Sequence, residues 1–190
     1  IGTNPRLEAP LINARVRKRW RSGRLAVGLL GPACDLSYPY THLGCDPRAL
    51  EAIARGEHPF AGELKAATRP ALIVGQGALR RPDGAAILAA ARAIAENCGL
   101  IRPADGWNGF NVLHTAAARA GGLDLGFVPG AGGLDVAGML AAAEAGSLDV
   151  VYLLGADEID MARLGKAFVI SPGHHGDAGA ARADVILPGA

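Results

Sequence analysis

Cysteine, aromatic residues and charge are all scarce in this 190-residue sequence. The three cysteines form no C-x-x-C pair, and their odd number argues against a disulfide framework. Charged residues make up 19% and the net charge is +1, so we expect no nucleic acid partner. No apolar run approaches the length of a membrane span, and no secretory signal is present, so we expect no direct membrane insertion.

Hydrophobic residues, in contrast, make up 50% of the sequence, and 27 glycines and 12 prolines interrupt them without a fixed period. This composition is typical of an α/β protein with a deeply buried sheet. The sequence opens with IGTNPR, without Met, and stops at VILPGA, just after an apparent strand. We therefore expect both ends to be cut from a longer polypeptide.

Short apolar runs rich in leucine and β-branched residues predict strands that are covered on both faces. These runs are residues 25–31, 71–77, 148–157, 167–173 and 184–189. Helix-like segments lie among them, with Asp83 and Asp135 as N-caps and Gly99 and Gly146 as terminators. The alternation predicts an α/β fold with a doubly wound, mostly parallel sheet and helices on both faces.

We expect one α/β domain over residues 1–190. Its first strand–helix units occupy 1–99, a glycine-rich loop or lid occupies 100–133, and second strand–helix units occupy 134–190. A short helix is also predicted over 110–121. The inward residues of the two longer helices are predicted to be Ile87, Ala90, Ala91, Ile94 and Cys98 in one, and Val136, Met139, Leu140 and Ala143 in the other.

The most basic segment is ARVRKRWRSGR, residues 14–24. Ile12, Val16 and Trp20 share one helix face there, and arginines cover the others. A nucleic acid role would need aromatic residues on an exposed face, and only Trp20 is present. The pattern predicts a solvated or partner-facing helix.

Several loops at strand ends hold candidate binding residues, because ligands bind at the carboxyl ends of parallel strands. The GTNP turn, Gly2 to Pro5, could offer backbone N–H groups to a phosphate or could be an ordinary capped turn. Asp157 and Glu158, after a later strand, could accept hydrogen bonds from a ribose or a guanine edge, or these residues and Asp160 could cap the next helix. The GQGALR loop has Arg80 where a dinucleotide fingerprint needs glycine, which argues against NAD binding.

The segment FVISPGHHGDAGAARADVILPG, residues 168–189, places His174, His175 and Asp177 in one loop. These side chains supply three zinc ligands at best, and adjacent histidines in an extended segment point in opposite directions. No serine or cysteine has a spacing that suggests a nucleophile–base pair with them. The residue types and their spacing alone therefore assign no function to this loop. A zinc site at Cys34, His42 and Cys45 would likewise lack a fourth ligand.

Five segments together resemble a known family: IGTNPRLEAPLINARVRKRW, GLLGPACDLSYPYTHLG, GQGALRRPDGAAILAAA, LLGADE and GHHGDAGAARADVILPGA. They are similar to the carboxyl-terminal region of the large iron–sulfur subunit of respiratory complex I, designated G in bacterial NADH:quinone oxidoreductase. The resemblance runs over nearly the whole sequence, with the motifs in the right order. It implies the fold of molybdopterin-dependent oxidoreductases such as formate dehydrogenase, with the cofactor lost and the scaffold kept.

The resemblance implies a structural and assembly region with no catalytic and no metal-binding residue of its own. The [4Fe-4S] and [2Fe-2S] ligands of the parent subunit would lie in an amino-terminal part absent here. Expected partners are that iron–sulfur part and other peripheral-arm subunits, on the cytoplasmic side of a bacterial membrane or the matrix side in a mitochondrion. The vestigial crevice would be formed by Gly2, Thr3, Asn4, Pro5, Asp157, Glu158, His174, His175, Asp177 and Asp184.

Two alternatives remain open. The protein could be a genuine pterin- or nucleotide-binding module of a molybdenum or tungsten oxidoreductase, in which case the crevice residues other than Asp177 would be candidates for contact with the cofactor. The crevice could also keep a regulatory nucleotide. We expect little or no thermal stabilisation by guanine or nicotinamide nucleotides, whereas binding at a hundredfold excess over Kd would add about 2.7 kcal/mol.

Overall fold

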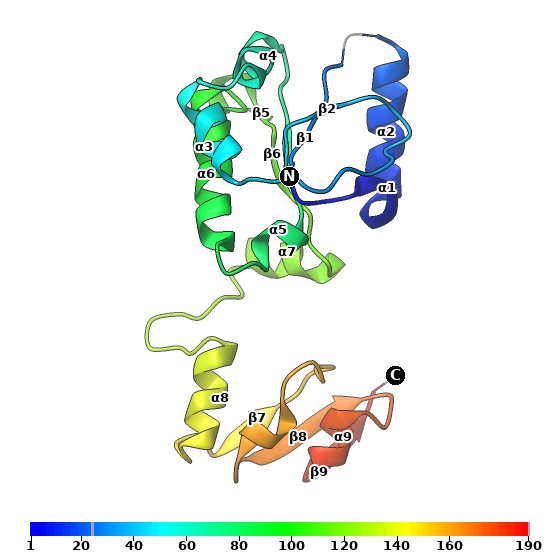
Figure 1. Ribbon diagram of the computed structural model, residues 1–190. Helices are drawn as coiled ribbons and strands as arrows, with labels where there is room; N and C mark the ends of the chain where they lie inside the picture. Colours follow the sequence, from blue (N-terminus) through cyan, green and yellow to red (C-terminus); the bar gives the residue numbers. More distant parts are fainter. Residues whose placement is uncertain (24, 190) are drawn as a thin grey trace. The chain divides into compact units, whose positions relative to one another are not determined.

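The computed structural model describes residues 1–23 and 25–189, so Arg24 and Ala190 lie outside the described residues. The polypeptide divides into two compact units, residues 1–120 and 121–190 (Figure 1). The boundary falls inside the segment 100–133 that the sequence predicts to be a loop or lid. That the whole sequence forms a single domain stays a prediction.

The first unit combines short strands with helices on their flanks (Figure 1). Its strands are β1 (Gly28–Leu29), β2 (Thr41–His42), β3 (Leu72–Val74), β4 (Ile101–Arg102), β5 (Trp107–Asn108) and β6 (Phe110–Val112). Its helices are α1 (Pro5–Glu8), α2 (Pro10–Arg21), α3 (Arg48–Arg55), α4 (Phe60–Ala66), α5 (Gln76–Leu79) and α6 (Gly84–Asn97), with a 3-10 turn at Pro103–Asp105. The helix α7 (Ala117–Asp124) crosses the boundary between the units.

The first residues of the sequence join two pairs of parallel strands in the first unit. β1 pairs with β2 and β3 pairs with β6, both in parallel. Between them, the Ile1 amino group donates to the Ile73 carbonyl at 2.8 Å, and Gly75 N–H donates to the Ile1 carbonyl at 2.9 Å. Gly2 N–H donates to the Leu30 carbonyl at 2.8 Å. The carboxyl ends of these parallel segments therefore meet at one edge.

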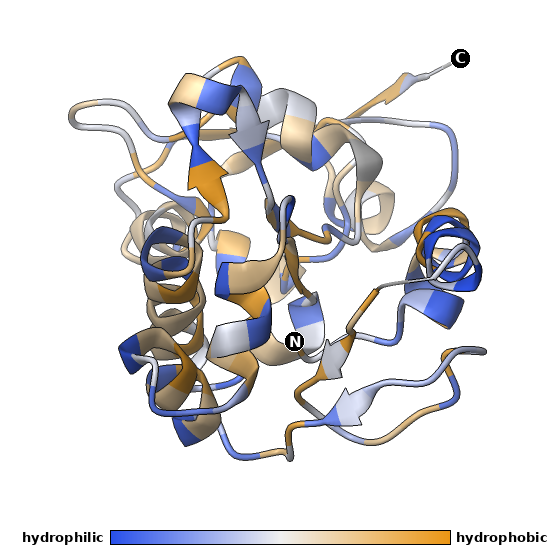
Figure 2. Cartoon of the chain, turned by 90° about the horizontal axis from the view of Figure 1, so that it is seen from above, coloured by the Kyte–Doolittle hydropathy of each residue, from blue (hydrophilic) through white to orange (hydrophobic). Residues whose placement is uncertain are grey.

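The core of the first unit lies between this parallel sheet and the helices α3 and α6. As predicted, α6 buries Ile87, Ala91, Ile94 and Cys98, while Ala90 is only half-buried. Leu50 of α3 packs into the same cluster and is 1% exposed. Figure 2 shows hydrophobic segments in orange among the packed helices and strands. Burial of this apolar face stabilises α6 more than the propensities of its residues do.

The second unit contains a three-stranded parallel sheet in the order β7–β8–β9. Its strands are β7 (Val150–Tyr152), β8 (Phe168–Gly173) and β9 (Val185–Pro188). Its helices are α8 (Val136–Glu144) and α9 (Ala178–Arg182), with a 3-10 turn, η2, at Met161–Leu164. The strands fall within three of the predicted apolar runs, and parallel pairing confirms the predicted sheet type.

Three local predictions were wrong. The helix predicted over 110–121 begins with strand β6, since Phe110 and Val112 pair beside β3, and α7 starts only at Ala117. Asp83 precedes α6 but makes no cap bond, because Arg81 holds its carboxylate at 2.7 Å. In α8, Leu140 and Ala143 are buried as predicted, whereas Val136 and Met139 are exposed.

The segment 100–133 contains regular structure in its first half. β4 and β5 form an antiparallel hairpin, and Trp107 Nε1 donates to the Pro70 carbonyl at 3.0 Å. Irregular backbone follows α7 at residues 125–135. Among the described residues, no helix is both long enough and apolar enough to cross a membrane.

Candidate functional site: the strand-end loops

The GTNP turn follows Ile1 at the carboxyl edge of the sheet in the first unit. Gly2 has φ +54°, in the left-handed region, and a Cβ there would lie 2.5 Å from the Cβ of Ala78. Only glycine fits this position, because both the backbone conformation and the close approach of α5 exclude a side chain. The turn thus packs against the neighbouring strand-end loop.

Asn4 and Pro5 start the helix α1. Asn4 Oδ1 accepts from Arg6 N–H at 3.2 Å, and Asn4 N–H donates to the Glu8 carboxylate at 2.6 Å. Pro5 is buried and occupies the first helical position, where its missing N–H costs nothing. Of the two interpretations that the sequence left open, the ordinary capped turn describes the contacts that Asn4 and Pro5 make.

A pocket of about 560 Å³ opens beside this turn. Its walls are largely apolar and include Leu30, Leu50 and Ile87, and its polar groups include Asn4 and Glu8. The complete lining is Ile1, Gly2, Thr3, Asn4, Glu8, Leu29, Leu30, Gly31, Pro32, Cys34, Cys45, Pro47, Leu50, Gly77, Ala78, Arg81 and Ile87. Sequence reasoning missed Glu8 and Arg81 as pocket residues, because charged residues flanking a helix are usually solvated.

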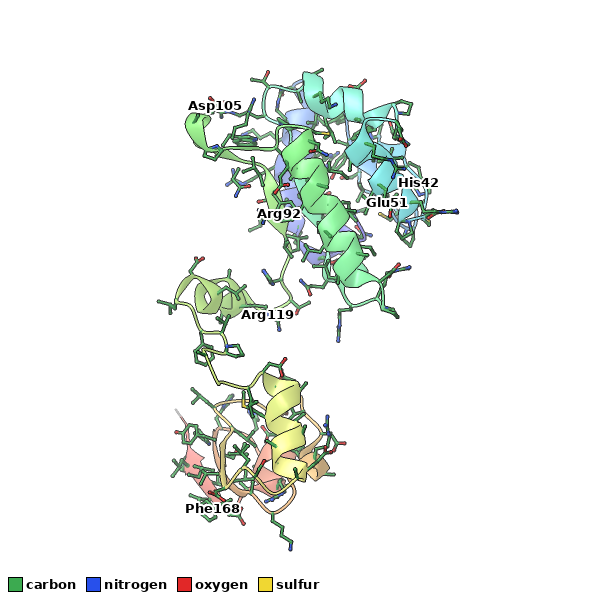
Figure 3. The ribbon with its side chains drawn as sticks, turned by 90° about the vertical axis from the view of Figure 1, so that its left-hand side faces the viewer. His42, Glu51, Arg92, Asp105, Arg119 and Phe168 are labelled. Atoms are coloured by element: carbon green, nitrogen blue, oxygen red, sulfur yellow. The ribbon has the colours of Figure 1, made fainter. Side chains whose placement is uncertain are left out.

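Cys34 and Cys45 both line the pocket, but Cys34 is unsuited to act as a thiolate. Burial raises the pKa of the Cys34 thiol, and the carboxylates of Asp35 and Glu8 raise it further. A thiol in this environment stays protonated at neutral pH, and nucleophiles and metal ligands are thiolates. His42, labelled in Figure 3, has its Nε2 2.8 Å from the Gly31 carbonyl oxygen.

The pocket is poorly suited to a phosphate-bearing dinucleotide, because several glycine N–H groups at this sheet edge are already occupied. Gly2 N–H donates to Leu30, Gly31 N–H to Gly44 at 2.8 Å, and Gly75 N–H to Ile1. The Glu8 carboxylate adds a negative charge that would repel a diphosphate, and the cation Arg81 in the lining is paired with Asp83. In contrast, the buried hydroxyl of Thr3 has no hydrogen-bond partner among the described residues, and one hydroxyl supplies a single donor. We therefore derive no chemistry through a pterin dinucleotide in this unit.

The other candidate residues lie at the carboxyl edge of β7–β8–β9 in the second unit. Asp157 and Glu158 follow β7 and are exposed, and His174 and His175 follow β8 and are exposed as well. The two imidazole rings meet edge to face, with centroids 4.3 Å apart and an interplanar angle of 62°. Backbone bonds from Gly155 N–H to Pro172 and from Gly189 N–H to Gly173 hold the three loops at one edge.

Asp177 and Asp184 have structural contacts in this unit. Asp177 Oδ1 accepts from Ala180 N–H at 3.0 Å and caps α9. Asp184 Oδ2 accepts from Val169 N–H at 2.8 Å, which ties β9 to the buried centre of β8. Asp160, rather than Asp157 or Glu158, caps the turn η2 through Ala162 N–H at 3.0 Å.

The structure assembles the ten crevice candidates in two sets. Gly2 to Pro5 belong to the first unit, and the other six belong to the second. Within the described residues 1–23 and 25–189, no group of three or more His, Cys, Asp or Glu side chains is arranged to hold a metal ion. That the crevice is free of cofactor stays a prediction.

Comparison with known proteins gives consistent names. The sequence is 44% identical over 189 residues to NADH dehydrogenase (ubiquinone) iron–sulfur protein 1 of Solanum tuberosum mitochondria, covering 99% of this protein and 24% of the relative. It is 43% identical over 190 residues to an NADH-quinone oxidoreductase subunit of Rickettsia bellii, covering 100% and 26%. It is 40% identical over 189 residues to the NADH-ubiquinone oxidoreductase 75 kDa subunit of Reclinomonas americana, covering 100% and 26%.

The protein spans about a quarter of the length of the curated relatives it matches. The family model for molybdopterin oxidoreductase matches it over residues 1–190. The parallel sheet with glycine-rich loops at its carboxyl edge, found in both units, agrees with that match. The chain therefore belongs to the molybdopterin oxidoreductase family, and relatives of similar sequence carry the names of NADH dehydrogenase and NADH–quinone oxidoreductase subunits.

Proposed function

We propose that residues 1–190 are a structural and assembly region of the large iron–sulfur subunit of an NADH:quinone oxidoreductase. The parent enzyme would pass electrons from NADH through FMN and iron–sulfur clusters to quinone, coupled to proton translocation. This region would carry no electrons and would pack against the iron–sulfur part of the subunit and other peripheral-arm subunits. The parent would sit peripherally on the cytoplasmic or matrix face of the membrane. Identity of 40–44% over the whole sequence supports the assignment.

The observation that carries a structural role is an uncovered apolar sheet face in the second unit. α8 and η2 pack on one face of β7–β8–β9, where Leu140, Leu153, Leu164 and Val169 form the core. The opposite face, called the open face below, lacks a covering helix among residues 121–189. Its members are Val150, Tyr152, Phe168, Ile170, Val185 and Leu187.

The strand register places these side chains on one side. Val150 is paired with Phe168, and Tyr152 with Ile170, which is paired in turn with Val185. Side chains alternate along a strand, so Val151 and Val169 point to the covered face, and Val169 is 0% exposed. Phe168, labelled in Figure 3, is 46% exposed, and Tyr152 is 56% exposed.

A parallel sheet with one bare apolar face is incomplete. Such sheets occur with both faces covered, because their strands are apolar on both sides. Full burial of one Val, Leu or Phe side chain is worth about 1.5–3 kcal/mol, so six neighbouring apolar side chains favour docking strongly. The open face therefore supports a scaffold that binds other parts of the same subunit.

The test uses the full-length subunit in its complex. We expect Phe168→Lys to lower the amount of assembled complex on native gels, because the lysine charge would have to be desolvated in the interface. Leu88→Lys, at a 38% exposed position on α6, is the matched control and should assemble normally. The double change His174→Ala and His175→Ala should leave NADH:quinone turnover per assembled complex unchanged. Normal assembly of Phe168→Lys, or loss of turnover in the histidine variant, would refute the proposal.

A further inference from the structure

The helix α2 carries an unusual concentration of positive charge. It contains no acidic residue, and it is mostly blue in Figure 2, at the right of the view. Its basic side chains are Arg15, Arg17, Lys18, Arg19 and Arg21. Like charges three or four residues apart on a helix destabilise it by a few tenths of a kcal/mol per pair. Lys18, Arg19 and Arg21 lie in the last turn, where the helix dipole favours cations, but Arg15 and Arg17 lie too far from that end to gain from it.

In the described part of the sequence outside α2, most arginines are paired with carboxylates. Eight arginines outside α2 form such pairs: Arg6, Arg48, Arg55, Arg81, Arg92, Arg102, Arg163 and Arg182. Within the described part of the sequence, no side chain of α2 takes part in an ion pair. Arg19 alone finds an internal partner, donating to Ser22 Oγ at 3.0 Å and to the Gly23 carbonyl at 2.8 Å. The charges of α2 thus lack the carboxylate partners that most of the other arginines have.

The orientation of α2 is fixed by a buried polar contact. Asn13, 5% exposed, donates from Nδ2 to the Leu36 carbonyl at 3.1 Å and accepts from the Tyr38 hydroxyl at 2.8 Å. Val16 and Trp20 are half-buried on the same side, as predicted, whereas Ile12 is 37% exposed and Asn13 takes the inward position. The bonds to Leu36 and Tyr38 fix which basic residues face outward.

A groove of about 690 Å³ runs between α2 and the loop that carries Ser37. Arg17, Lys18 and Arg21 line it from the helix, and Ser37 lines it from the loop. Successive helical residues turn by about 100°, so Arg15 and Arg19 lie on the face opposite Arg17 and Arg21. Arg6 at the end of the groove is already paired with Asp35. The groove is therefore a built concave surface with three uncompensated cations.

We infer that this groove docks an acidic segment of a neighbouring subunit, an inference that depends on the proposed function. An arginine guanidinium can bind a carboxylate through two parallel hydrogen bonds, so Arg17 and Arg21 suit clustered Asp and Glu side chains. Leu11, 81% exposed, shares a helix face with Lys18 and offers an apolar anchor beside the cations. Apolar and cationic groups side by side fit an amphipathic acidic protein segment.

Two features favour protein over nucleic acid or membrane. Trp20 is half-buried against the unit, so α2 offers no exposed aromatic ring for base stacking. The net charge of +1 gives the protein no general attraction to a polyanion or an anionic lipid surface.

The first experiment compares two double charge reversals in the full-length subunit. Arg17→Glu with Arg21→Glu should lower the amount of subunit recovered with the complex about tenfold, equivalent to about 1.4 kcal/mol of binding free energy. Arg15→Glu with Arg19→Glu makes the same charge change on the opposite face and should be recovered as the wild type is. This control carries the larger structural penalty, because Arg19 also bonds to Ser22 and Gly23.

The second experiment identifies the occupant through the single lysine of α2. A carbodiimide joins an amine to a carboxylate only where the two are in contact, so treatment of the wild-type complex should link Lys18 to an Asp or Glu of another subunit. Lys65 and Lys166 serve as internal controls on other surfaces.

The outcomes separate the two proposals. Failure of the wild-type subunit to purify with a complex would refute the proposed function itself. Normal assembly of the Arg17→Glu, Arg21→Glu variant together with no Lys18 cross-link would overturn the docking inference alone. Loss in that variant of bound nucleic acid, or of cosedimentation with phosphatidylserine vesicles, would overturn it in favour of a different anionic partner.

Discussion

Gly75→Ala tests how closely the strand-end loops of the first unit are packed. A Cβ at Gly75 would lie 2.5 Å from Thr3 Cβ and 2.6 Å from the Gly2 carbonyl oxygen. Contacting carbon atoms normally lie about 3.5–4.0 Å apart, so about an ångström of movement is needed. The Gly2 backbone is held by its bond to Leu30 and cannot move freely.

Two opposing effects set the magnitude of this substitution. Gly75 has φ −92° and ψ 158°, which alanine adopts readily, so the smaller entropy of the unfolded state would stabilise the variant by about 0.4–1 kcal/mol. Overpacking a close contact costs about 1–3 kcal/mol. Two of the clashes involve Thr3 Cβ and the Gly2 carbonyl oxygen, which cannot rotate away. The steric cost therefore exceeds the entropic gain. We expect net destabilisation of about 1–2 kcal/mol.

Urea unfolding of the wild type and two variants measures this difference. Gly62→Ala is the matched control, since Gly62 lies in α4 and no atom lies within 4 Å of the position that an added methyl group would take. This control should stabilise the protein by about 0.5–1 kcal/mol. If Gly75→Ala is as stable as the wild type or more stable, the segment Gly2–Thr3 moves easily to make room for the methyl group. The crevice would then be open and adaptable, against the account of a packed scaffold.

Three further predictions concern caps, charges and ligands. Asp135→Ala removes the cap bond to Gly138 N–H and should cost about 1 kcal/mol by urea unfolding, whereas no loss would show the cap to be dispensable. The Arg163 guanidinium lowers the pKa of Glu144, so this pair stabilises the fold above the ordinary carboxyl pKa of about 4.3. The melting-temperature advantage over Glu144→Gln should disappear as the pH falls through the lowered pKa, and an advantage that persists in acid would contradict this. GDP and NADH should leave the melting temperature unchanged, and a clear rise would indicate a retained nucleotide site.

The parallel strands and the two main helices could be predicted because local pattern and tertiary environment agree there. Residues 71–77 and 167–173 are apolar on both faces, and the stripe from Ile87 to Cys98 has the helical period. The pattern at 110–121 misled because Phe110, Leu113 and Ala117 have helical spacing, whereas Phe110 and Val112 alternate as in a strand. Residues 110–112 form a strand because they pair with β3, nearly forty residues away in the sequence.

The candidate site was predictable in position but not in chemistry. Glycine-rich strand ends locate the loops, and Asp177 lies in the loop after β8. Its capping bond to Ala180 depends on where α9 begins, which the sequence did not indicate. The charge of Glu8 in the pocket and the bonds of Gly31 and Gly75 were also hidden, because they depend on which distant backbone segments become neighbours.

We propose that this member of the molybdopterin oxidoreductase family is a scaffold without the cofactor. Elemental analysis of the full-length subunit, purified in its complex without metal supplementation, tests this most directly. We expect molybdenum and tungsten far below one atom per subunit, with iron present from clusters bound elsewhere. Stoichiometric molybdenum or tungsten that is lost when Gly2 and Gly75 are replaced by alanine would contradict it.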